Sequence, residues 1–342
     1  MSRRPSERTA GEMPIDRTPA ARLVGVRRLE QVEAPVPDPG PGEVLIRVLA
    51  MGLCGSDAHW FREGGIGDAT IPQGGVIPGH EFCGVIESGP RQGERVAIDP
   101  AIPCLECEEC ARGKLNLCLR MRFAGHGSTD GALRRHLVWP ERCLVSLPDS
   151  VPDDEGALLE PLGIALHATD LGDVGVSDAT GVIGCGPIGL LVISALFAQG
   201  VKTILAAELL DHRLAVAREL GAERWSDDSG LDVVFDCAGT DESLHTALEA
   251  LAPGGRVVMV GVPDGDRTSF VASLARRKEA SLLTCRRMLP EDLERAAALA
   301  GAGEVDLGAL ITHRFPMSSA HSAFETLVAR TGIKVVVLPG HS

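Results

Sequence analysis

Four of the ten cysteines of the chain lie within one stretch of fifteen residues, as Cys104, Cys107, Cys110 and Cys118. Four thiolates at this spacing can surround a zinc ion tetrahedrally with no position left open, which is typical of a structural site. Free thiols would instead leave four reactive groups unpaired on a surface loop. Disulfides fit less well, because the chain is long and shows no secretory signal. The sequence therefore predicts a structural zinc in this loop.

Other residues of metal-ligating type are dispersed along the chain. Cys54 occurs in Cys-Gly-Ser-Asp, His80 and Glu81 in Gly-His-Glu, and Glu160 in Glu-Pro-Leu. Taken one at a time each is weak, since a lone cysteine after a strand is usually a core residue. A lone histidine is likewise more often a hydrogen-bonded polar residue than a ligand. Their meaning depends on whether the fold brings them together.

A glycine-rich motif follows an apolar strand and opens a helix. It reads Gly184, Cys185, Gly186, Pro187, Ile188, Gly189. The first glycine permits the tight turn, the second lets the backbone approach a pyrophosphate, and the third allows close packing of helix and strand. The helix N-terminus offers free N–H groups and positive potential to phosphate. The motif predicts a dinucleotide site, and the alternative is a plain glycine turn between buried elements.

An acidic residue follows the next strand, nineteen residues beyond the last glycine of the motif. This residue, Glu208, would accept hydrogen bonds from the ribose hydroxyls and repel a 2′-phosphate, so NAD is favoured over NADP. Small residues at the ends of later strands could also face the cofactor or form plain turns. The further candidates are Arg213, Ala238, Val260 and Val262.

The elements that must position these residues fall into two textures. Between residues 43 and 145, short β segments broken by glycine and proline indicate a loop-rich β domain. After Pro148, strands, glycine turns and helices alternate, which is typical of βαβ units and a parallel sheet. Only eleven residues separate Gly221 from the strand at Val233, too few for a strand and a full crossover helix, so this part of the sheet is expected to be trimmed.

Composition narrows the class of partner. The net charge of −14 disfavours nucleic acid and anionic lipid, and a small molecule is the better expectation. No apolar run approaches the roughly 20 residues needed to span a bilayer, so we expect no membrane association. Residues 1–20, rich in Arg, Ser, Thr and Pro, predict a disordered extension. The reducing compartment that suits the cysteines favours a cytoplasmic protein.

Taken together, the motifs occur in the order and spacing of the zinc-containing medium-chain dehydrogenase/reductase family. The resemblance runs from about Ala21 to Pro339 and is closest to the polyol branch typified by sorbitol dehydrogenase, with threonine dehydrogenase as a near relative. The stretches 99–104 and 123–126 point the same way. The implied fold is α/β, with a GroES-like β-rich catalytic domain at 21–164 and 296–342 and a Rossmann doubly wound parallel-sheet domain at 165–295.

The resemblance implies a second zinc, a catalytic one, bound by Cys54 and His80 with Glu81 and Glu160 in the carboxylate roles. Which of the two carboxylates binds directly stays open. One sulfur, one nitrogen and one oxygen leave a position free, as a catalytic site requires. Asp57 matches a carboxylate that would accept the free N–H of His80 and fix its tautomer.

The resemblance also implies an NAD-linked oxidation of a secondary alcohol to a ketone, or the reverse. Ser56 and His59 stand at the proton-relay positions, although His59 could equally be an exposed loop residue. Trp60, Phe123 and Arg286, with its neighbour Arg287, match stretches that face the substrate or the cofactor. An arginine there could hold vicinal hydroxyls or a carboxylate.

The substrate class stays open between a sugar alcohol or other polyol, a cyclitol, and an amino alcohol such as threonine. The chain contains no tyrosine, so a hydroxyl contact common in the polyol branch is missing at Trp60. A rival reading is a non-catalytic NAD- and zinc-binding protein of the same fold. Family members are commonly homodimers or homotetramers, so the resemblance implies a homo-oligomer.

Overall fold

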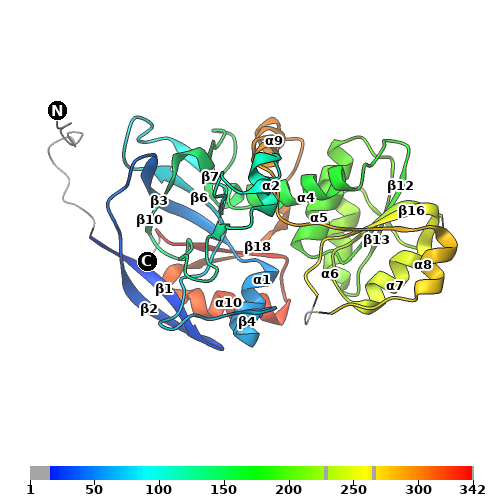
Figure 1. Ribbon diagram of the computed structural model, residues 1–342, viewed down its shortest axis with the longest axis horizontal. Coiled ribbons are helices and arrows are strands. Elements are labelled where there is room, and N and C mark those ends of the chain that lie inside the picture. Colours follow the sequence, from blue (N-terminus) through cyan, green and yellow to red (C-terminus); the bar gives the residue numbers. More distant parts are fainter. Residues whose placement is uncertain (1–15, 227–229, 264–266, 341–342) are drawn as a thin grey trace.

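The computed structural model describes residues 16–226, 230–263 and 267–340 of the chain. Figure 1 shows two lobes side by side, one built largely of strands and the other of helices around a sheet. Each lobe has the texture that its part of the sequence predicts, so the mixed α/β class is confirmed. No helix among the described residues is both long and apolar enough to cross a membrane.

The first lobe is organised around a seven-stranded sheet. Its strands are β3 (Glu43–Gly52), β6 (Glu81–Ile86), β7 (Arg95–Ile98), β10 (His136–Pro140), β11 (Leu144–Ser146), β18 (Ile311–Pro316) and β19 (Lys334–Leu338). They lie in the order β11-β7-β6-β3-β19-β18, with β10 paired to β3. Along β3 every second side chain, including Val44, Ile46 and Val48, is buried, because one face of the strand lies on the core. The last strand of the chain thus lies beside the strand that ends at Gly52.

Shorter elements surround this sheet. The strands are β1 (Arg17–Gly25), β2 (Arg28–Pro35), β4 (Gly65–Ile66), β5 (Ala69–Thr70), β8 (Ala101–Ile102) and β9 (Arg122–Phe123). The helices are α1 (Gly55–Glu63), α2 (Glu108–Ala111), α3 (Asp153–Gly156) and α10 (Ala320–Ala329), and the 3-10 turns are η1 (Leu115–Leu117), η2 (Glu141–Cys143), η3 (Gly308–Leu310) and η4 (Met317–Ser319).

The second lobe carries a parallel sheet in the order β14-β13-β12-β15-β16-β17. Its strands are β12 (Ala179–Ile183), β13 (Thr203–Ala207), β14 (Glu223–Arg224), β15 (Leu231–Asp236), β16 (Leu251–Met259) and β17 (Ser281–Thr284). Its helices are α5 (Pro187–Ala198), α6 (Asp211–Glu219), α7 (Asp241–Ala250) and α8 (Ala272–Lys278). The strand order reverses at β12, and in such sheets ligands bind outside the carboxyl ends of the strands at that point.

Two helices lie between the lobes. Helix α4 (Leu159–Leu171) packs against α5 and against α9 (Pro290–Ala302), as Figure 1 shows. Most residues of α4 are buried, which suits a helix packed between two layers. The expected domain limits at 164/165 and 295/296 fall inside these two helices. We propose that the chain crosses from one domain to the other along them.

The structure bears on two expectations from the sequence, the disordered N-terminal extension and the shortened stretch near 222–232. The predicted disordered extension is wrong for residues 17–20, because these belong to β1, which pairs with β2 in an antiparallel hairpin. Its first fifteen residues lie outside the described part. The trimmed stretch near 222–232 retains the two-residue strand β14, and the described residues between β14 and β15 form no helix.

Candidate metal centres and cofactor site

The first candidate metal centre forms where β3 and β6 run side by side. Gly52 of β3 is paired with Glu81 of β6. Two residues after Gly52, Cys54 is the N-cap of helix α1. His80 lies directly before β6, whose first residue is Glu81. One ligand atom from each of Cys54, His80 and Glu81 lies within 4.8 Å of those of the other two. Two segments far apart in the sequence therefore present a sulfur, a nitrogen and an oxygen to one point.

Residues of the first turn of α1 surround the histidine. The backbone N–H of Cys54 donates to Asp57 Oδ2 at 2.9 Å, which ties the start of the helix together. Ser56 Oγ lies 3.4 Å from His80 Nε2. The expected hydrogen bond from His80 to Asp57 is not made, since Nδ1 and Oδ1 are 3.9 Å apart and Nδ1 is buried without a hydrogen-bond partner. The Asp57 carboxylate instead accepts a hydrogen bond from the backbone N–H of Cys54.

Glu81 is held by a buried lysine from the last strand. Lys334 Nζ donates to Glu81 Oε2 and, at 3.1 Å, to the carbonyl oxygen of Leu53. Both side chains are almost fully buried, at 1% and 2% exposure. A Cβ at Gly52 would collide with the Glu81 carboxylate and with Lys334, so glycine makes room for this pair. Lys334 thus contacts Oε2 of the Glu81 carboxylate.

The second expected carboxylate lies in the first turn of α4. Glu160 is buried, and its Oε2 has no hydrogen-bond partner in the described structure. Burial raises the pKa of this carboxyl well above its usual range, and His80 partly opposes the rise. Glu160 does not belong to the three-atom group of Cys54, His80 and Glu81, but it is near enough to interact with each of them.

Burial governs the protonation of the groups at this centre. Burial, reinforced by Glu81, raises the pKa of the Cys54 thiol to about 12. Burial also raises the pKa of Asp57. Burial thus disfavours the anionic forms of these groups, and a bound cation would favour the thiolate that coordinates a metal. A sulfur, a nitrogen and a carboxylate oxygen are ligands that zinc prefers, so the residues fit a zinc ion.

The second candidate metal centre is the four-cysteine loop around α2 and η1. The four sulfur atoms lie within 4.8 Å of one another. Cys107 Sγ is 3.5 Å from Cys110 Sγ and 3.9 Å from Cys118 Sγ. Sulfurs bound at about 2.3 Å around a tetrahedral zinc are roughly 3.8 Å apart, so these spacings fit. The backbone N–H of Glu106 lowers the pKa of the Cys104 thiol to about 6, which favours the thiolate that zinc binds.

The candidate dinucleotide site lies at the carboxyl ends of the parallel strands. The strand pairings place Ile183, Ala207, Asp236, Met259 and Thr284 in one row across the sheet. The glycine motif follows the first of these residues and leads into α5, whose first residue is Pro187. Gly184 has a φ of 88°, a conformation that favours glycine, and a Cβ at Gly189 would collide with its carbonyl oxygen. The turn therefore has the shape that the motif predicts.

Glu208 and Arg213 flank this turn. Glu208 Oε2 accepts from the N–H of Cys185 at 2.8 Å, and Oε1 accepts from Leu209 and Leu210 at 2.7 and 3.0 Å. Arg213 donates to the carbonyl oxygen of Gly332 at 2.9 Å, while its Nε is buried without a partner. A Cβ at Gly186 would lie 3.6 Å from Arg213 Nη1, so the guanidinium borders the glycine turn.

The remaining cofactor candidates surround the same place. A Cβ at Gly184 would meet the backbone of Ala238 at 2.9 Å, so the first two loops touch. The N–H of Val260 donates to the carbonyl oxygen of Asp236 at 2.8 Å. Val262 is half exposed and follows the same strand end. The structure thus brings the loops after β12, β15 and β16 together.

The chain matches the alcohol dehydrogenase GroES-like domain over residues 40–149 and the zinc-binding dehydrogenase domain over residues 187–302. L-idonate 5-dehydrogenase of Vitis vinifera is 35% identical over 348 residues, which covers 93% of each chain. The probable D-xylulose reductase A of Aspergillus fumigatus is 33% identical and covers 92% of this chain and 95% of its own. The solved L-idonate 5-dehydrogenase of Escherichia coli superposes with a TM-score of 0.88 at 26% identity, covering 94% and 98%.

The chain belongs to the zinc-binding alcohol dehydrogenase family. The predicted resemblance, the GroES-like and Rossmann-type fold and the assignment as an oxidoreductase acting on an alcohol are therefore confirmed. Zinc binding is a property of the family. The residues that hold each ion in this dehydrogenase are taken up as proposals below.

Aromatic side chains line one side of the candidate metal centre of Cys54, His80 and Glu81. The Phe123 ring lies 5.3 Å from the His80 ring, and His126 lies 5.5 Å from His80 and 5.4 Å from Trp60. Trp60 is buried, and its Nε1 has no partner in the described structure. Burial lowers the pKa of His126 to about 3, so this ring stays neutral. Sequence analysis placed Trp60 and Phe123 near the centre but assigned no role to His126.

The two neighbouring arginines and His59 take different positions. The side chain of Arg286 is exposed, and its carbonyl oxygen accepts from Asn116 Nδ2 at 3.0 Å. Arg287 is the arginine that packs on the predicted pocket residue Phe123, with Cζ 4.4 Å from the ring centroid. His59 lies on α1, 3.4 Å from Glu63 one turn later. The helix, rather than a loop, therefore holds His59.

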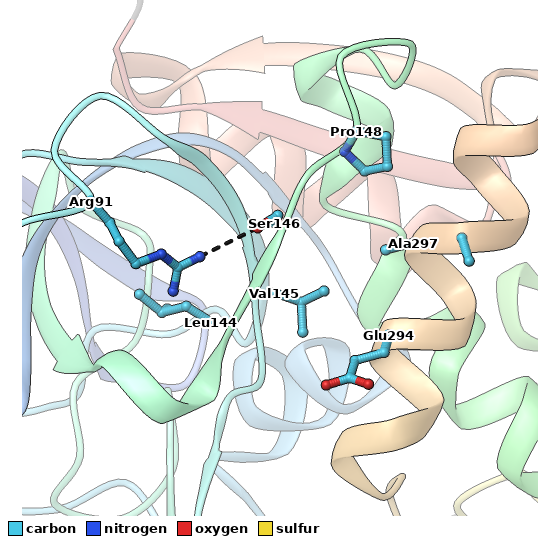
Figure 2. A pocket seen from close by; sticks show the side chains of 8 residues that line it. Arg91, Leu144, Val145, Ser146, Pro148, Glu294 and Ala297 are labelled. Carbon is cyan, nitrogen blue, oxygen red and sulfur yellow. Dashed lines mark hydrogen bonds between the residues drawn. The ribbon is translucent and has the colours of Figure 1, made fainter.

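The hollow drawn in Figure 2 lies elsewhere on the dehydrogenase, between β11 and α9. Its lining includes Arg91, Ser146, Pro148 and Glu294, and Arg91 Nη2 donates to Ser146 Oγ at 3.4 Å. None of the residues predicted for metal, cofactor or substrate lines this hollow. We assign it no part in the reaction.

Removal of one sulfur from the four-cysteine loop is expected to destabilise the dehydrogenase. With Cys107→Ser we expect loss of about one zinc per chain and a fall in Tm of several degrees, because the loop has little apolar core to replace the metal. Metal analysis and thermal unfolding test this. Cys285→Ser, outside both cysteine and metal groups, is the matched control, and an unchanged zinc content in Cys107→Ser would contradict the assignment.

Proposed function

We propose that this dehydrogenase uses zinc and NAD to interconvert a secondary alcohol and its ketone. The convergence of Cys54, His80 and Glu81 within 4.8 Å carries the proposal, because it supplies ligands and leaves a position open. We propose a polyol, sugar alcohol or cyclitol as substrate class. The names of the relatives, which refer to idonate and xylulose, support that choice.

In this proposal Cys54, His80 and Glu81 hold the catalytic zinc. Glu81 is the stronger candidate for the carboxylate ligand, since it belongs to the three-atom group and its Oε1 is not used by Lys334. The bound zinc supplies positive charge that favours the alkoxide form of the substrate hydroxyl near neutral pH. Glu160, buried with a free Oε2, accepts a hydrogen bond from the hydroxyl and orients it.

The parallel-sheet lobe receives the dinucleotide in the same proposal. NAD, when bound, accepts the hydride from the carbinol carbon, and the alcohol leaves as a ketone with release of one proton. The free N–H groups at the start of α5 bind the pyrophosphate, and Glu208 binds the ribose. Arg213 at the edge of the turn adds positive charge beside the phosphates.

The released proton needs a route to solvent. Ser56 Oγ, 3.4 Å from His80 Nε2, lies next to the place where the substrate hydroxyl binds. His59 follows on the same helix, and its side chain is 15% exposed. We propose that the proton passes from the hydroxyl to Ser56 and leaves through His59.

We further propose a second, structural zinc held by Cys104, Cys107, Cys110 and Cys118, and assembly as a homodimer or homotetramer. The sulfur spacings support the second ion. The oligomer rests on the family resemblance, and light scattering tests it. A monomeric mass at working concentration would end that part of the proposal.

A substrate screen tests the proposed function. The zinc-loaded protein is incubated with NAD and with L-iditol, D-sorbitol, xylitol, a cyclitol and L-threonine, and NADH absorbance is followed with and without a chelator. We expect NADH formation with one or more polyols and its loss on chelation. Absence of turnover with every alcohol, in a protein that holds zinc, would support the non-catalytic reading instead.

The choice of NAD over NADP is expected to depend on Glu208. Glu208→Ala removes the carboxylate that receives three backbone N–H groups and repels a 2′-phosphate. Loss of charge-assisted hydrogen bonds of this kind costs about 1.5 to 3 kcal/mol, so we expect the KM for NAD to rise about tenfold or more while use of NADP improves. Glu219→Ala, at the exposed end of α6, is the control. Equal effects on the two cofactors would contradict the assigned role.

A further inference from the structure

Arg287 lies in the turn between the end of β17 and the start of α9. Arg287 has a φ of 58°, in the left-handed region that few side chains adopt without cause. The preceding carbonyl, that of Arg286, accepts from Asn116 Nδ2 at 3.0 Å. Asn116 belongs to η1 inside the four-cysteine loop and is itself buried. The loop therefore helps to fix the backbone from which Arg287 projects.

The side chain of Arg287 reaches toward the catalytic centre. Its Cζ lies 4.4 Å from the Phe123 ring centroid, and that centroid lies 5.3 Å from the centroid of the His80 ring. Because the two distances share one point, the guanidinium carbon is within about 10 Å of the His80 ring centre. Asp99 and Glu160 are near enough to act on its charge. Arg287 thus belongs to the surroundings of the proposed reaction centre.

The guanidinium of Arg287 is charged and incompletely satisfied. Its Nη1 is buried and has no hydrogen-bond partner among the described residues. Asp99 contributes negative charge nearby, but its Oδ1 accepts from the N–H of Ala101 and no hydrogen bond joins it to Arg287 among the described residues. A buried donor without a partner is costly, and a buried charge without a counterion more so. Arg287 Nη1 therefore lacks a hydrogen-bond acceptor among the described residues.

We propose that Arg287 binds an anionic group at the far end of the substrate, so that this enzyme acts on a polyol acid or polyol phosphate in preference to a neutral polyol. The inference rests on the proposed function, and it narrows the substrate class. Phe123 supports the guanidinium by a cation–π contact. The free edge of the guanidinium then presents its N–H groups to a carboxylate or phosphate, both of which arginine binds in bidentate fashion.

The distance suits a short sugar acid. In a 5-hydroxy hexonate the oxidised carbon is four bonds from the carboxyl carbon, which spans about 5 Å when extended. Zinc and its ligands at one end and a hydrogen bond to Arg287 at the other add about 2 and 3 Å. A hexonate is therefore long enough to reach Arg287, whose guanidinium carbon lies no more than about 10 Å from the His80 ring centre. A neutral polyol would offer Arg287 Nη1 no charged acceptor.

The test compares two matched pairs of compounds on the zinc-loaded enzyme with NAD. L-idonate and L-iditol differ only by a carboxylate, and D-sorbitol 6-phosphate and D-sorbitol differ only by a phosphate. We expect kcat/KM to favour the anionic member of at least one pair by about tenfold or more. The pair with the larger preference identifies the source of the anion.

Variants assign the preference to the side chain. We expect Arg287→Gln to lower kcat/KM for the preferred anion about tenfold or more, mainly through KM, and to change kcat/KM for its neutral counterpart less than about twofold. Arg287→Lys, which keeps the charge but loses the planar fork, should fall between. Arg277→Gln, at an exposed position of α8 outside every assigned site, is the matched control. Tm and zinc content are measured for each variant to exclude misfolding.

Calorimetry with the same four compounds separates this inference from the proposed function. We expect the anionic member to bind the NADH-loaded enzyme about tenfold more tightly than its neutral partner, and Arg287→Gln to remove the difference. Turnover of neutral and anionic members alike, with no effect of Arg287→Gln, would overturn the inference while the proposed function stands. Anion binding through Arg287 without any turnover would contradict the proposed function while the inference about Arg287 stands. An effect confined to the KM for NAD would also overturn the inference.

Discussion

Cys54→Ser is expected to lower kcat/KM by about a thousandfold or more, equivalent to about 4 kcal/mol of transition-state stabilisation. The reason is that Cys54 supplies the one sulfur of the three-atom group with His80 and Glu81. A serine hydroxyl is a far poorer zinc ligand than a thiolate. We expect the zinc content to fall by about one ion per chain, because the four-cysteine loop keeps its own.

Two controls make this result specific. Cys285→Ser removes a half-buried thiol that belongs to neither metal group and should keep both zinc and activity. A Tm for Cys54→Ser close to that of the parent excludes global unfolding as the cause. Full activity of Cys54→Ser with undiminished zinc would show that the ion, if present, is held by other residues.

Lys334→Met is expected to have the largest effect on stability. The lysine is buried, and its one carboxylate ion-pair partner among the described residues is Glu81, which belongs to the candidate zinc site. Removal of one member of a buried ion pair leaves an uncompensated charge and typically lowers the free energy of unfolding by about 3 to 5 kcal/mol. We expect this loss in the zinc-free protein and a smaller one in the zinc-loaded protein, because the cation then compensates Glu81.

Chemical denaturation with and without a chelator measures both values. The double variant Glu81→Gln with Lys334→Met should recover part of the loss in the zinc-free protein, since no unpaired charge remains. Lys202→Met, at an exposed position, should change the free energy of unfolding by less than about 0.5 kcal/mol. If Lys334→Met were equally mild, the pair would contribute little to holding Glu81.

Local patterns in the sequence predicted much of the fold correctly. The β-rich texture between residues 43 and 145 and the alternation of strands and helices after Pro148 agree with the prediction, because hydrophobic periods with glycine or proline at their edges mark these elements. The four-cysteine loop was visible for the same reason, since its ligands are neighbours along the chain. Fold prediction was weaker at β1, where Arg, Thr and Pro hide a strand whose alternate residues Thr18 and Ala20 are buried.

Contacts between distant segments were beyond the reach of the sequence. Lys334 and Glu81 are 253 residues apart, and only the placement of β19 beside β3 brings them together. A lysine opening the apolar strand Lys334–Leu338 was the one available signal. Likewise the sequence does not indicate which of the neighbouring residues Arg286 and Arg287 is exposed and which packs on Phe123. Tertiary packing decides such details.

The proposal of a catalytic zinc is tested most directly by diffraction from crystals of the zinc-loaded protein on both sides of the zinc absorption edge. The account predicts two anomalous peaks per chain, one among Cys54, His80 and a carboxylate oxygen and one among the four loop sulfurs. A single peak in the loop, with Cys54 and His80 bound to no metal, would contradict it.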